Sequence, residues 1–513
     1  MLLLVSFLLT ALGSYDLLTE GSYDNFYFVP FFVFGFLALG YSLVVKRKEW
    51  FIYGFLLFYF LVPHAGNSMP FLGRYIPRLE STNSGFLFRL FALNALTLAL
   101  WRTKAYANVS ERAAKRLILF FLLSLACASL YGIYLISAAG VWSYYNIDMS
   151  NWIQGIYCPL LAAVFYLGLR RWIVTFEQQQ VIVVLLAIAA LLLVLELTFE
   201  FAVPIASLNH LSFHDSGRFN SIIYLDFDEV GLFAGIGFLA WLYLAFRFRS
   251  FVFSAMLPMT FLVCYFTYQR TAMFSPLIAC VPFALIYREV SKKTWLCTIG
   301  LFLVLFTLDW NSIFDGIVYL LQSKVREADA FGADTLMLRF ALWMRALDAI
   351  IYSFPFGVGE GFGRYFMFSP DVPKLFSAIG HWNAIAGNFY SRAAEMDFQT
   401  NSHNIFTQFF MEYGVMGLFC LALLGRLAFS TYRKSRVFIG SDDGKRLYLA
   451  AILAMLVMIL IYSIFDPVMS ITYVLVMLLV DMLDVRPSRY SVVLQDASAP
   501  GPTRDLQSVS NHA

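Results

Sequence analysis

Apolar runs long enough to cross a bilayer alternate with short polar breaks along most of the chain. A transmembrane helix needs about 20 mostly apolar residues, so each run predicts one membrane-spanning helix. The runs predict about fourteen spans, of which the first and third are short. They cover residues 2–13, 26–45, 50–64, 86–101, 117–139, 152–169, 180–200, 221–246, 250–268, 271–287, 294–310, 405–425, 447–465 and 468–484. We therefore expect an all-α polytopic membrane protein.

One interval between the apolar runs, residues 311–404, is too polar to cross lipid and far longer than an ordinary connection. It contains an amphipathic stretch, "IFDGIVYLLQSKV" (313–325), and a Pro/Gly-rich turn region, "FPFGVGEGFGRYF" (354–366). We expect it to form one long, partly helical extracytoplasmic loop. The expected domains are transmembrane helices 1–11 in residues 1–310, the large loop in 311–404, helices 12–14 in 405–484 and a disordered cytoplasmic tail in 485–513.

Composition and charge agree with a membrane protein. The chain is 60% hydrophobic and 13% charged, whereas about a quarter of the residues of a soluble domain are charged. Basic residues gather in alternate polar breaks, for example Lys46–Lys48, Arg170 with Arg171, and Lys445 with Arg446. Because such residues mark the cytoplasmic side, both termini are predicted to be cytoplasmic. No GxxxxGK[ST] motif or soluble nucleotide-binding domain is present in the sequence, and nothing indicates a nucleic-acid partner.

Three arginines lie on the predicted extracytoplasmic side, against the positive-inside trend. Arg270, in "TYQRTAMF", falls between two spans with almost no loop, and an ionisable group at that depth usually faces a cavity or a partner. The planar donors of arginine suit phosphate oxygens, so Arg270, Arg339 and Arg218 are candidate ligands for a lipid phosphate or pyrophosphate. The alternatives are an interfacial anchor for Arg270 and an ordinary loop position for Arg218. For Arg339 the alternative is an ion pair with Asp334 or Asp348 on a surface helix.

Acidic residues open one of the predicted spans. The stretch "YLDFDEVG" (224–231) contains Asp226, Asp228 and Glu229. The D-x-D spacing invites a metal site of the kind that nucleotide-sugar transferases use, since hard cations want several oxygen ligands. On the predicted topology these acids face the outside, where nucleotide sugars are absent. We therefore favour acids stabilised by a helix N-terminus, or pairing with an arginine.

A histidine stands at a polar-to-apolar junction in "TNSHNIFTQFFMEYGVMG" (400–417). In one interpretation Asn401, Ser402 and His403 cap the following helix, with Ser402 as a competent N-cap and His403 in water. In the other, an imidazole near arginines at the mouth of a cavity acts as a general base. Local chemistry leaves both interpretations open, and they do not exclude each other.

Four stretches in this order resemble the O-antigen ligase and O-antigen polymerase superfamily (the ligase/Wzy C-terminal type). They are "GRFNSIIYLDFDEVG", "YQRTA", "LRFALWMRALDAIIYSFPFGVGEGFG" and "NSHNIFTQFFMEYGVMG". The resemblance covers residues 216–424, and it rests on the order of the motifs, each of which is weak alone. Three departures stand out: "DFDE" replaces the usual Asp-Pro-Asn, Gln269 stands where serine is common, and the predicted spans outnumber those of a typical ligase.

The resemblance implies an inverting, metal-independent glycosyltransferase of the GT-C type that uses no cofactor and no nucleotide sugar. Its donor would be an oligosaccharide on undecaprenyl pyrophosphate, and its acceptor another saccharide or a lipid A core. The enzyme would lie in the bacterial inner membrane, with the active site facing the periplasm. By this resemblance His403 matches the catalytic histidine.

The resemblance also assigns the remaining candidate residues. Arg270 and Arg339, and less closely Arg218, match arginines that engage the pyrophosphate. The supporting candidates are Asn404, Asp226 and Asp228.

The acceptor separates several possible functions. Polymerases vary more in length than ligases, so the long chain favours an O-antigen or exopolysaccharide polymerase, with a chain-length regulator protein as a partner. A ligase to lipid A core and a protein O-oligosaccharyltransferase remain alternatives. A transporter or flippase can also have about fourteen spans, but such proteins tend to show internal repeats and midplane charges. We find no such repeat in the sequence.

Overall fold

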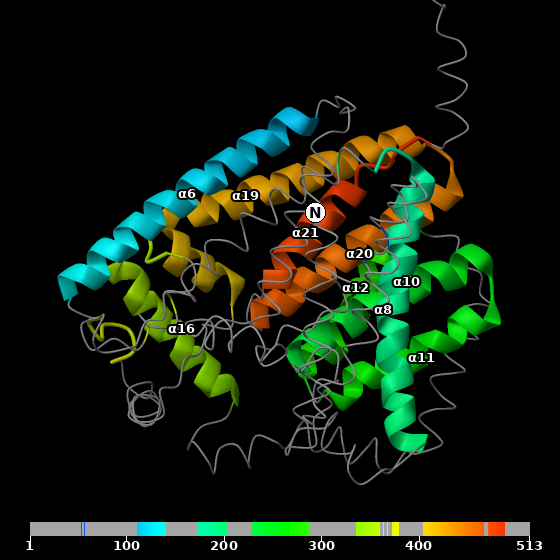
Figure 1. Cartoon of the computed structure of the whole chain (residues 1–513), viewed down its shortest axis with the longest axis horizontal. Coiled ribbons are helices and arrows are strands. Elements are labelled where there is room, and N and C mark those ends of the chain that lie inside the picture. The colour runs from blue at the N-terminus through cyan, green and yellow to red at the C-terminus, as the bar shows by residue number, and fades with distance from the viewer. Residues whose placement is uncertain are drawn as a thin grey trace, which may run out of the picture.

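The computed structural model describes residues 53, 56, 110–139, 170, 173–202, 227–267, 269–287, 335–359, 363, 367, 372–378, 404–465 and 470–487. Within these residues every regular element is a helix (Figure 1). The helices are α6 (Ser110–Ala139), α8 (Phe176–Ala202), α10 (Phe227–Phe248), α11 (Phe251–Phe266), α12 (Arg270–Ile286), α16 (Thr335–Tyr352), α19 (Ile405–Ile439), α20 (Asp443–Phe465) and α21 (Ser470–Met482). The predicted spans 2–13, 26–45, 86–101, 152–169 and 294–310, nearly all of 50–64, and the amphipathic stretch 313–325 lie outside the described residues.

The prediction of an all-helical, multi-pass membrane protein is confirmed for the described part of the chain. There, α6, α8, α10, α19 and α20 are long and apolar enough to cross a membrane, and α11 and α12 are shorter apolar helices. The bounds of α11, α12 and α20 agree with the predicted spans to within a few residues, because an apolar run of bilayer length largely determines a membrane helix. The total of about fourteen spans stays a prediction.

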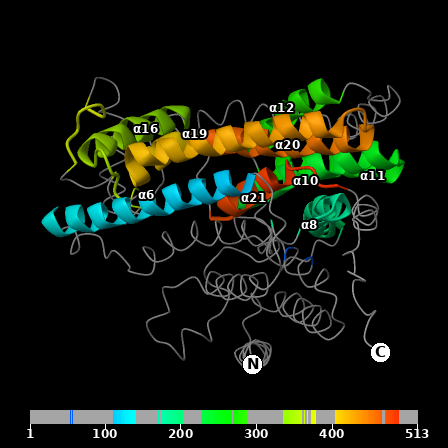
Figure 2. The ribbon, with the colours of Figure 1, turned by 90° about the horizontal axis from the view of Figure 1, so that it is seen from above.

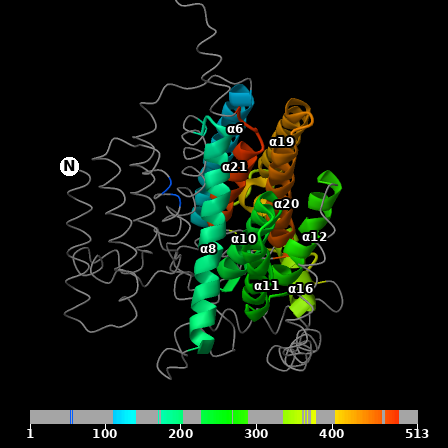
Figure 3. The same cartoon turned by 90° about the vertical axis from the view of Figure 1, so that its right-hand side faces the viewer.

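Helix α10 is the centre of the described bundle. All its side chains from Glu229 to Phe246 are buried, and it packs against α8, α11, α12 and α20 (Figure 3). A helix that is apolar on all faces needs such surroundings. Two glycines allow close approach: a Cβ at Gly235 would lie 2.2 Å from Met458 Cε, and a Cβ at Gly237 would lie 2.0 Å from Ala190 Cβ. Small residues of this kind let membrane helices pack closely.

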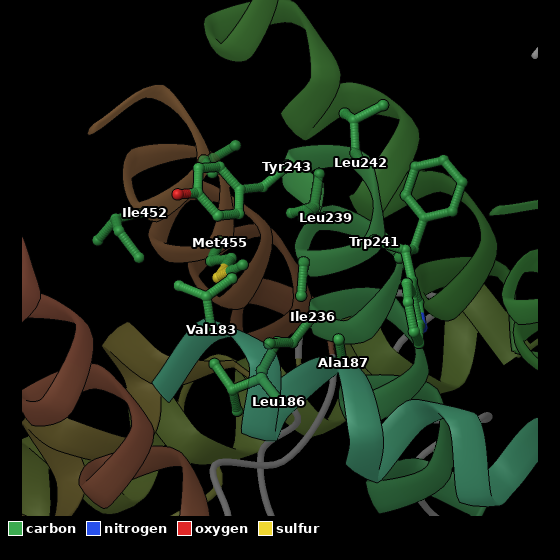
Figure 4. Packing of buried hydrophobic residues seen from close by; sticks show 14 of the residues in the cluster. Val183, Leu186, Ala187, Ile236, Leu239, Trp241, Leu242, Tyr243, Ile452 and Met455 are labelled. Carbon is green, nitrogen blue, oxygen red and sulfur yellow. The ribbon is translucent and has the colours of Figure 1, made fainter. Parts of the chain in front are cut away.

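Side chains from three helices interlock in this core. In Figure 4, Val183 and Leu186 of α8 lie beside Ile236 and Leu239 of α10, and Met455 of α20 completes the cluster. Lipid tails are as apolar as these side chains, so close packing rather than transfer from water holds the helices together. Substitutions that open or overfill this core are therefore expected to disturb helix placement.

Contacts between helix ends show which ends of the helices lie together in the bundle. Lys445 at the start of α20 lies 5.8 Å from the ring centroid of Phe176 at the start of α8. A Cβ at Gly444 would lie 2.8 Å from Nη1 of Arg247, near the end of α10. The starts of α8 and α20 and the end of α10 therefore share one end of the bundle, which carries basic residues predicted to be cytoplasmic.

The chain after α21 folds back onto this same end. Arg170 and Arg486 each pair with Asp481, at 3.5 and 3.2 Å, and with Asp484, at 3.2 and 2.7 Å. The carbonyl of Pro487 accepts a hydrogen bond of 3.1 Å from the first residue of α8. The packed chain thus reaches into the segment that was predicted as a disordered tail from residue 485; the rest of that segment lies outside the described residues.

Candidate functional site

The start of α12 is tied to the last turn of α20 at the opposite end of the bundle. The Tyr462 hydroxyl donates a hydrogen bond of 2.6 Å to Oε1 of Gln269, and both side chains are buried. Gln269 directly precedes Arg270, and its backbone N–H donates to Oγ1 of Thr267 (3.4 Å) at the end of α11. The short turn predicted between these two helices is therefore confirmed. Gln269, noted from sequence only as a departure from the family pattern, is part of what fixes that turn.

The start of α10 joins the same junction. A Cβ at Gly231 would lie 2.8 Å from Gln269 Oε1, 3.1 Å from the Tyr462 hydroxyl and 2.7 Å from Ala272 Cβ. Because it has no side chain, Gly231 leaves space for the hydrogen bond between Gln269 and Tyr462. Glu229, in the first turn of α10, is also buried, at the N-terminal position where a helix dipole favours an acid.

The start of α19 is tied to the same turn of α20. Asn404 is the N-cap: its Oδ1 accepts from the amides two and three residues on, at 2.9 and 3.2 Å. Its Nδ2 donates to the carbonyl of Ile464 on α20, at 3.1 Å. The assignment of the cap to Ser402 was wrong: both residue types cap helices well, and the helix begins where the asparagine also reaches α20. His403 directly precedes the N-cap.

The last turn of α20 therefore gathers the starts of three helices, α10, α12 and α19. Its Tyr462 and Ile464 bond to the immediate neighbours of Arg270 and His403. A helix N-terminus presents unpaired N–H groups and the positive end of the dipole, which favour an anion. The positive dipole ends of these helices therefore favour an anion at this end of the bundle, and at the start of α19 the Asn404 side chain already pairs two of the amides.

Buried polar residues continue from this junction into the protein. Asn404, Gln408 and Glu412 follow at intervals of four, so they share one face of α19. All three are buried, and Gln408 Nε2 donates to Glu412 Oε2 at 3.3 Å. Buried polar groups in membrane helices usually face a functional interior. The spacing of these three residues is visible in the sequence, but their burial is not.

Helix α19 is longer than the predicted span 405–425, and it is broken at Gly414. The backbone there has φ 63° and ψ −152°, a region that only glycine adopts readily. The amide of Val415 donates instead to the carbonyl of Pro355, at 3.0 Å. A Cβ at Gly414 would lie only 1.9 Å from that carbonyl oxygen. The Pro/Gly-rich region predicted as a turn thus lies against the break.

Residues 355–359 also satisfy two carbonyls on the other side of the break. The amide of Val358 donates to Met411 O at 2.9 Å, and the amide of Gly359 donates to Glu412 O at 2.8 Å. Broken backbone inside a membrane protein is stable only where other protein groups take over its hydrogen bonds. The glycine-rich motif is therefore explained here by backbone pairing with α19.

The same loop connects the site to α16, which packs against α19 (Figure 2). Arg339 lies in the second turn of α16. Its side chain is half-buried and interacts with other groups of the protein. Along the helix it is about 20 Å from Tyr352, where the loop begins, and Asn404 is about 15 Å from Gly414 on α19. Arg339 therefore lies towards the end of α16 that is far from this loop.

Arg345 and Asp348 form a buried ion pair that the sequence did not single out. Their charged atoms are 3.5 Å apart, and the two residues are 2% and 1% exposed. Arg345 also donates to the carbonyls of Met367, Val372 and Pro373. Asp348 accepts from the amides of Leu375, Phe376 and Ser377 and from the Ser377 hydroxyl. Asp348 thus pairs with Arg345, so the suggested ion pair between Asp348 and Arg339 was wrong. The i,i+3 spacing was the available signal.

Several predicted site residues are placed only in part. Asp228 lies in the first turn of α10 and Arg270 is the first residue of α12, and the side chains of both lie outside the described structure. The candidates wholly outside the described residues are Arg218, Asp226 and His403. Within the described part of the chain, no group of three or more His, Cys, Asp or Glu side chains could hold a metal ion.

The fold and this site define a multi-pass helical membrane protein with three helix starts gathered at one end. Residues 255–422 match the family model described as O-antigen ligase. The matched segment, about a third of the chain, contains Arg270, Arg339 and His403, and the match confirms the resemblance to the O-antigen ligase and polymerase superfamily. Comparison with curated proteins gave no match.

Proposed function

We propose that this protein is a membrane glycosyltransferase that polymerises oligosaccharide units carried on undecaprenyl pyrophosphate. The reaction takes place at the periplasmic face of the bacterial inner membrane, without a metal ion. The family match supports the class of enzyme. The observation that carries the residue assignment is the last turn of α20, which bonds to the neighbours of both Arg270 and His403.

In this mechanism His403 is the general base and the reaction is a single displacement. A hydroxyl of the acceptor sugar attacks the anomeric carbon of the donor as the imidazole of His403 takes its proton. The new glycosidic C–O bond forms as the bond to the pyrophosphate oxygen breaks, so the anomeric configuration inverts. Imidazole suits this role because it titrates near neutral pH.

The leaving group is undecaprenyl pyrophosphate, which gains negative charge as the bond breaks. Arg270 and Arg339, with Arg218, stabilise that charge, since guanidinium groups bind phosphate oxygens through paired donors. The positive dipole ends of the converging helix starts have the same preference. The predicted loop 311–404 carries Arg339 and orients the acceptor, and its backbone pairing with α19 links it to the helix that His403 precedes.

A ligase that transfers finished glycan to lipid A core is the second candidate. The description of the matched family, O-antigen ligase, favours it. The predicted number of spans, about fourteen, favours a polymerase by the resemblance described above. A polymerase would work with a chain-length regulator protein, and a protein O-oligosaccharyltransferase would share the same donor.

Glycan gels of a deletion strain test both the class and the acceptor. The strain is complemented with the wild type, with His403→Ala, or with His381→Ala, a control histidine of the same predicted loop outside the quoted motifs. We expect product from the wild type and the control and none from His403→Ala at equal membrane levels. Product from His403→Ala would refute the assignment of the base. Single-repeat glycan in the deletion strain indicates a polymerase, and full-length glycan missing only from the core indicates a ligase.

A further inference from the structure

We propose that Tyr462 and Gln269 are positioning residues that set the place of Arg270 for pyrophosphate binding. The inference rests on the proposed function and deepens it, because it names the groups that hold the arginine. Tyr462 lies in α20, outside the segment that matches the family model, so the family match does not assign it a role. The geometry at the start of α12 carries the inference.

Gln269 occupies the N-cap position of α12, but its side chain makes no capping hydrogen bond to its own helix. Its Oε1 accepts the Tyr462 hydroxyl at 2.6 Å instead, and the residue is 8% exposed. Its carbonyl accepts the Met273 amide at 3.2 Å, which fixes it to the first turn of the helix. Gln269 therefore joins α20 to the backbone that leads directly into Arg270.

The surroundings leave this side chain little freedom. A Cβ at Gly231 of α10 would overlap the Gln269 side chain and its hydrogen bond to Tyr462, so only glycine leaves room for them. The backbone N–H of Gln269 donates to the Thr267 hydroxyl, which fixes the main chain at this position. The first turn of α12 is thus held by groups from α10, α11 and α20. Catalysis depends on such placement, because a shift of about 1 Å can reduce a rate about a hundredfold.

The same helix offers a matched control at its other end. Tyr448 is also a buried tyrosine of α20, and its hydroxyl donates to the carbonyl of Met482 at 3.3 Å, at the end of the bundle away from Arg270. Tyr462→Phe deletes the buried hydrogen bond to the start of α12, and Tyr448→Phe deletes the buried hydrogen bond to the end of α21. A purely structural role predicts similar consequences for Tyr462→Phe and Tyr448→Phe, whereas positioning predicts that only Tyr462→Phe impairs the site.

The experiment measures binding of undecaprenyl pyrophosphate to the full-length protein in lipid nanodiscs, together with the apparent Tm of each variant. A single buried hydrogen bond corresponds to a change in affinity of about threefold to tenfold. We expect Tyr462→Phe and Gln269→Met to weaken binding by this factor. The double variant should be no weaker than either single variant, because both changes remove the same interaction. Tyr448→Phe should bind like the wild type.

Arg270→Ala separates failure of this inference from failure of the proposed function. If the wild type does not bind the lipid, or if Arg270→Ala binds as well as the wild type, the proposed function is wrong at this site. If Arg270→Ala is impaired and Tyr462→Phe binds normally, only the positioning role is overturned. It is also overturned if Tyr448→Phe weakens binding as much as Tyr462→Phe, in proportion to the loss of Tm.

Discussion

Replacing Gly414 by alanine should disrupt the break in α19 and the loop that is paired with it. Alanine would be held at φ 63° and ψ −152°, a conformation that costs a residue other than glycine about 1–3 kcal/mol. Its Cβ would also lie 1.9 Å from Pro355 O and 2.6 Å from the carbonyl carbon of Phe356. Both neighbours are backbone atoms, so the overlap is relieved only if the loop moves.

Movement of the loop would weaken the three backbone hydrogen bonds between residues 355–359 and the broken helix. Each contributes about 0.5–1.5 kcal/mol, so strain and lost bonds together should lower the free energy of unfolding by about 3–7 kcal/mol. Denaturant titration of the purified protein in mixed micelles measures this change. Transfer activity should fall with it, because the same loop joins α16 to α19.

Gly425→Ala is the control in the same helix. No heavy atom lies within 4 Å of the position of its Cβ. Alanine is favoured over glycine in a helix by about 1 kcal/mol, so this variant should be as stable as the wild type or slightly more stable. Equal stabilities for Gly414→Ala and Gly425→Ala would refute the account of the break.

Three further variants test other parts of the structure. Asp348→Ala should lower the free energy of unfolding by about 3–5 kcal/mol, because it leaves Arg345 buried without its acid; an unchanged unfolding midpoint would contradict this. Arg486→Ala should lower the apparent Tm, because Asp481 and Asp484 lose a partner, whereas removal of the chain after residue 487 should not; equal Tm values for the two would count against the packing of this segment. Gly231→Ala should weaken binding of undecaprenyl pyrophosphate, because its methyl group would displace the side chains that hold the start of α12; binding at wild-type strength would argue against that packing.

The sequence predicted the helices of the bundle well, because bilayer length and apolar composition suffice to locate a span. The break in α19 was not predictable in this way. Nothing in "EYGVMG" marks Gly414 as non-helical, and the break depends on Pro355, almost sixty residues earlier in the chain. Contacts between distant segments leave no local periodicity to read.

The sequence singled out the motifs of the candidate site but not the residues that pack around them. Arg270 stood out because a charge between two spans is unfavourable in lipid. Tyr462 did not, because a tyrosine within an apolar run is ordinary in a membrane helix. The position of the cap at Asn404 likewise depends on the carbonyl of Ile464, which only the folded chain brings near.

In the proposed mechanism His403 and Arg270 serve one site with different roles. Transfer by the purified protein in nanodiscs, with a lipid-linked donor and a saccharide acceptor, tests it when binding of undecaprenyl pyrophosphate is measured in parallel. Loss of a general base reduces the rate by about a hundredfold or more. We predict that His403→Ala loses transfer by this factor but binds undecaprenyl pyrophosphate as the wild type does. We predict that Arg270→Ala loses both transfer and binding. Transfer at the wild-type rate by His403→Ala, or normal binding by Arg270→Ala, would contradict the account.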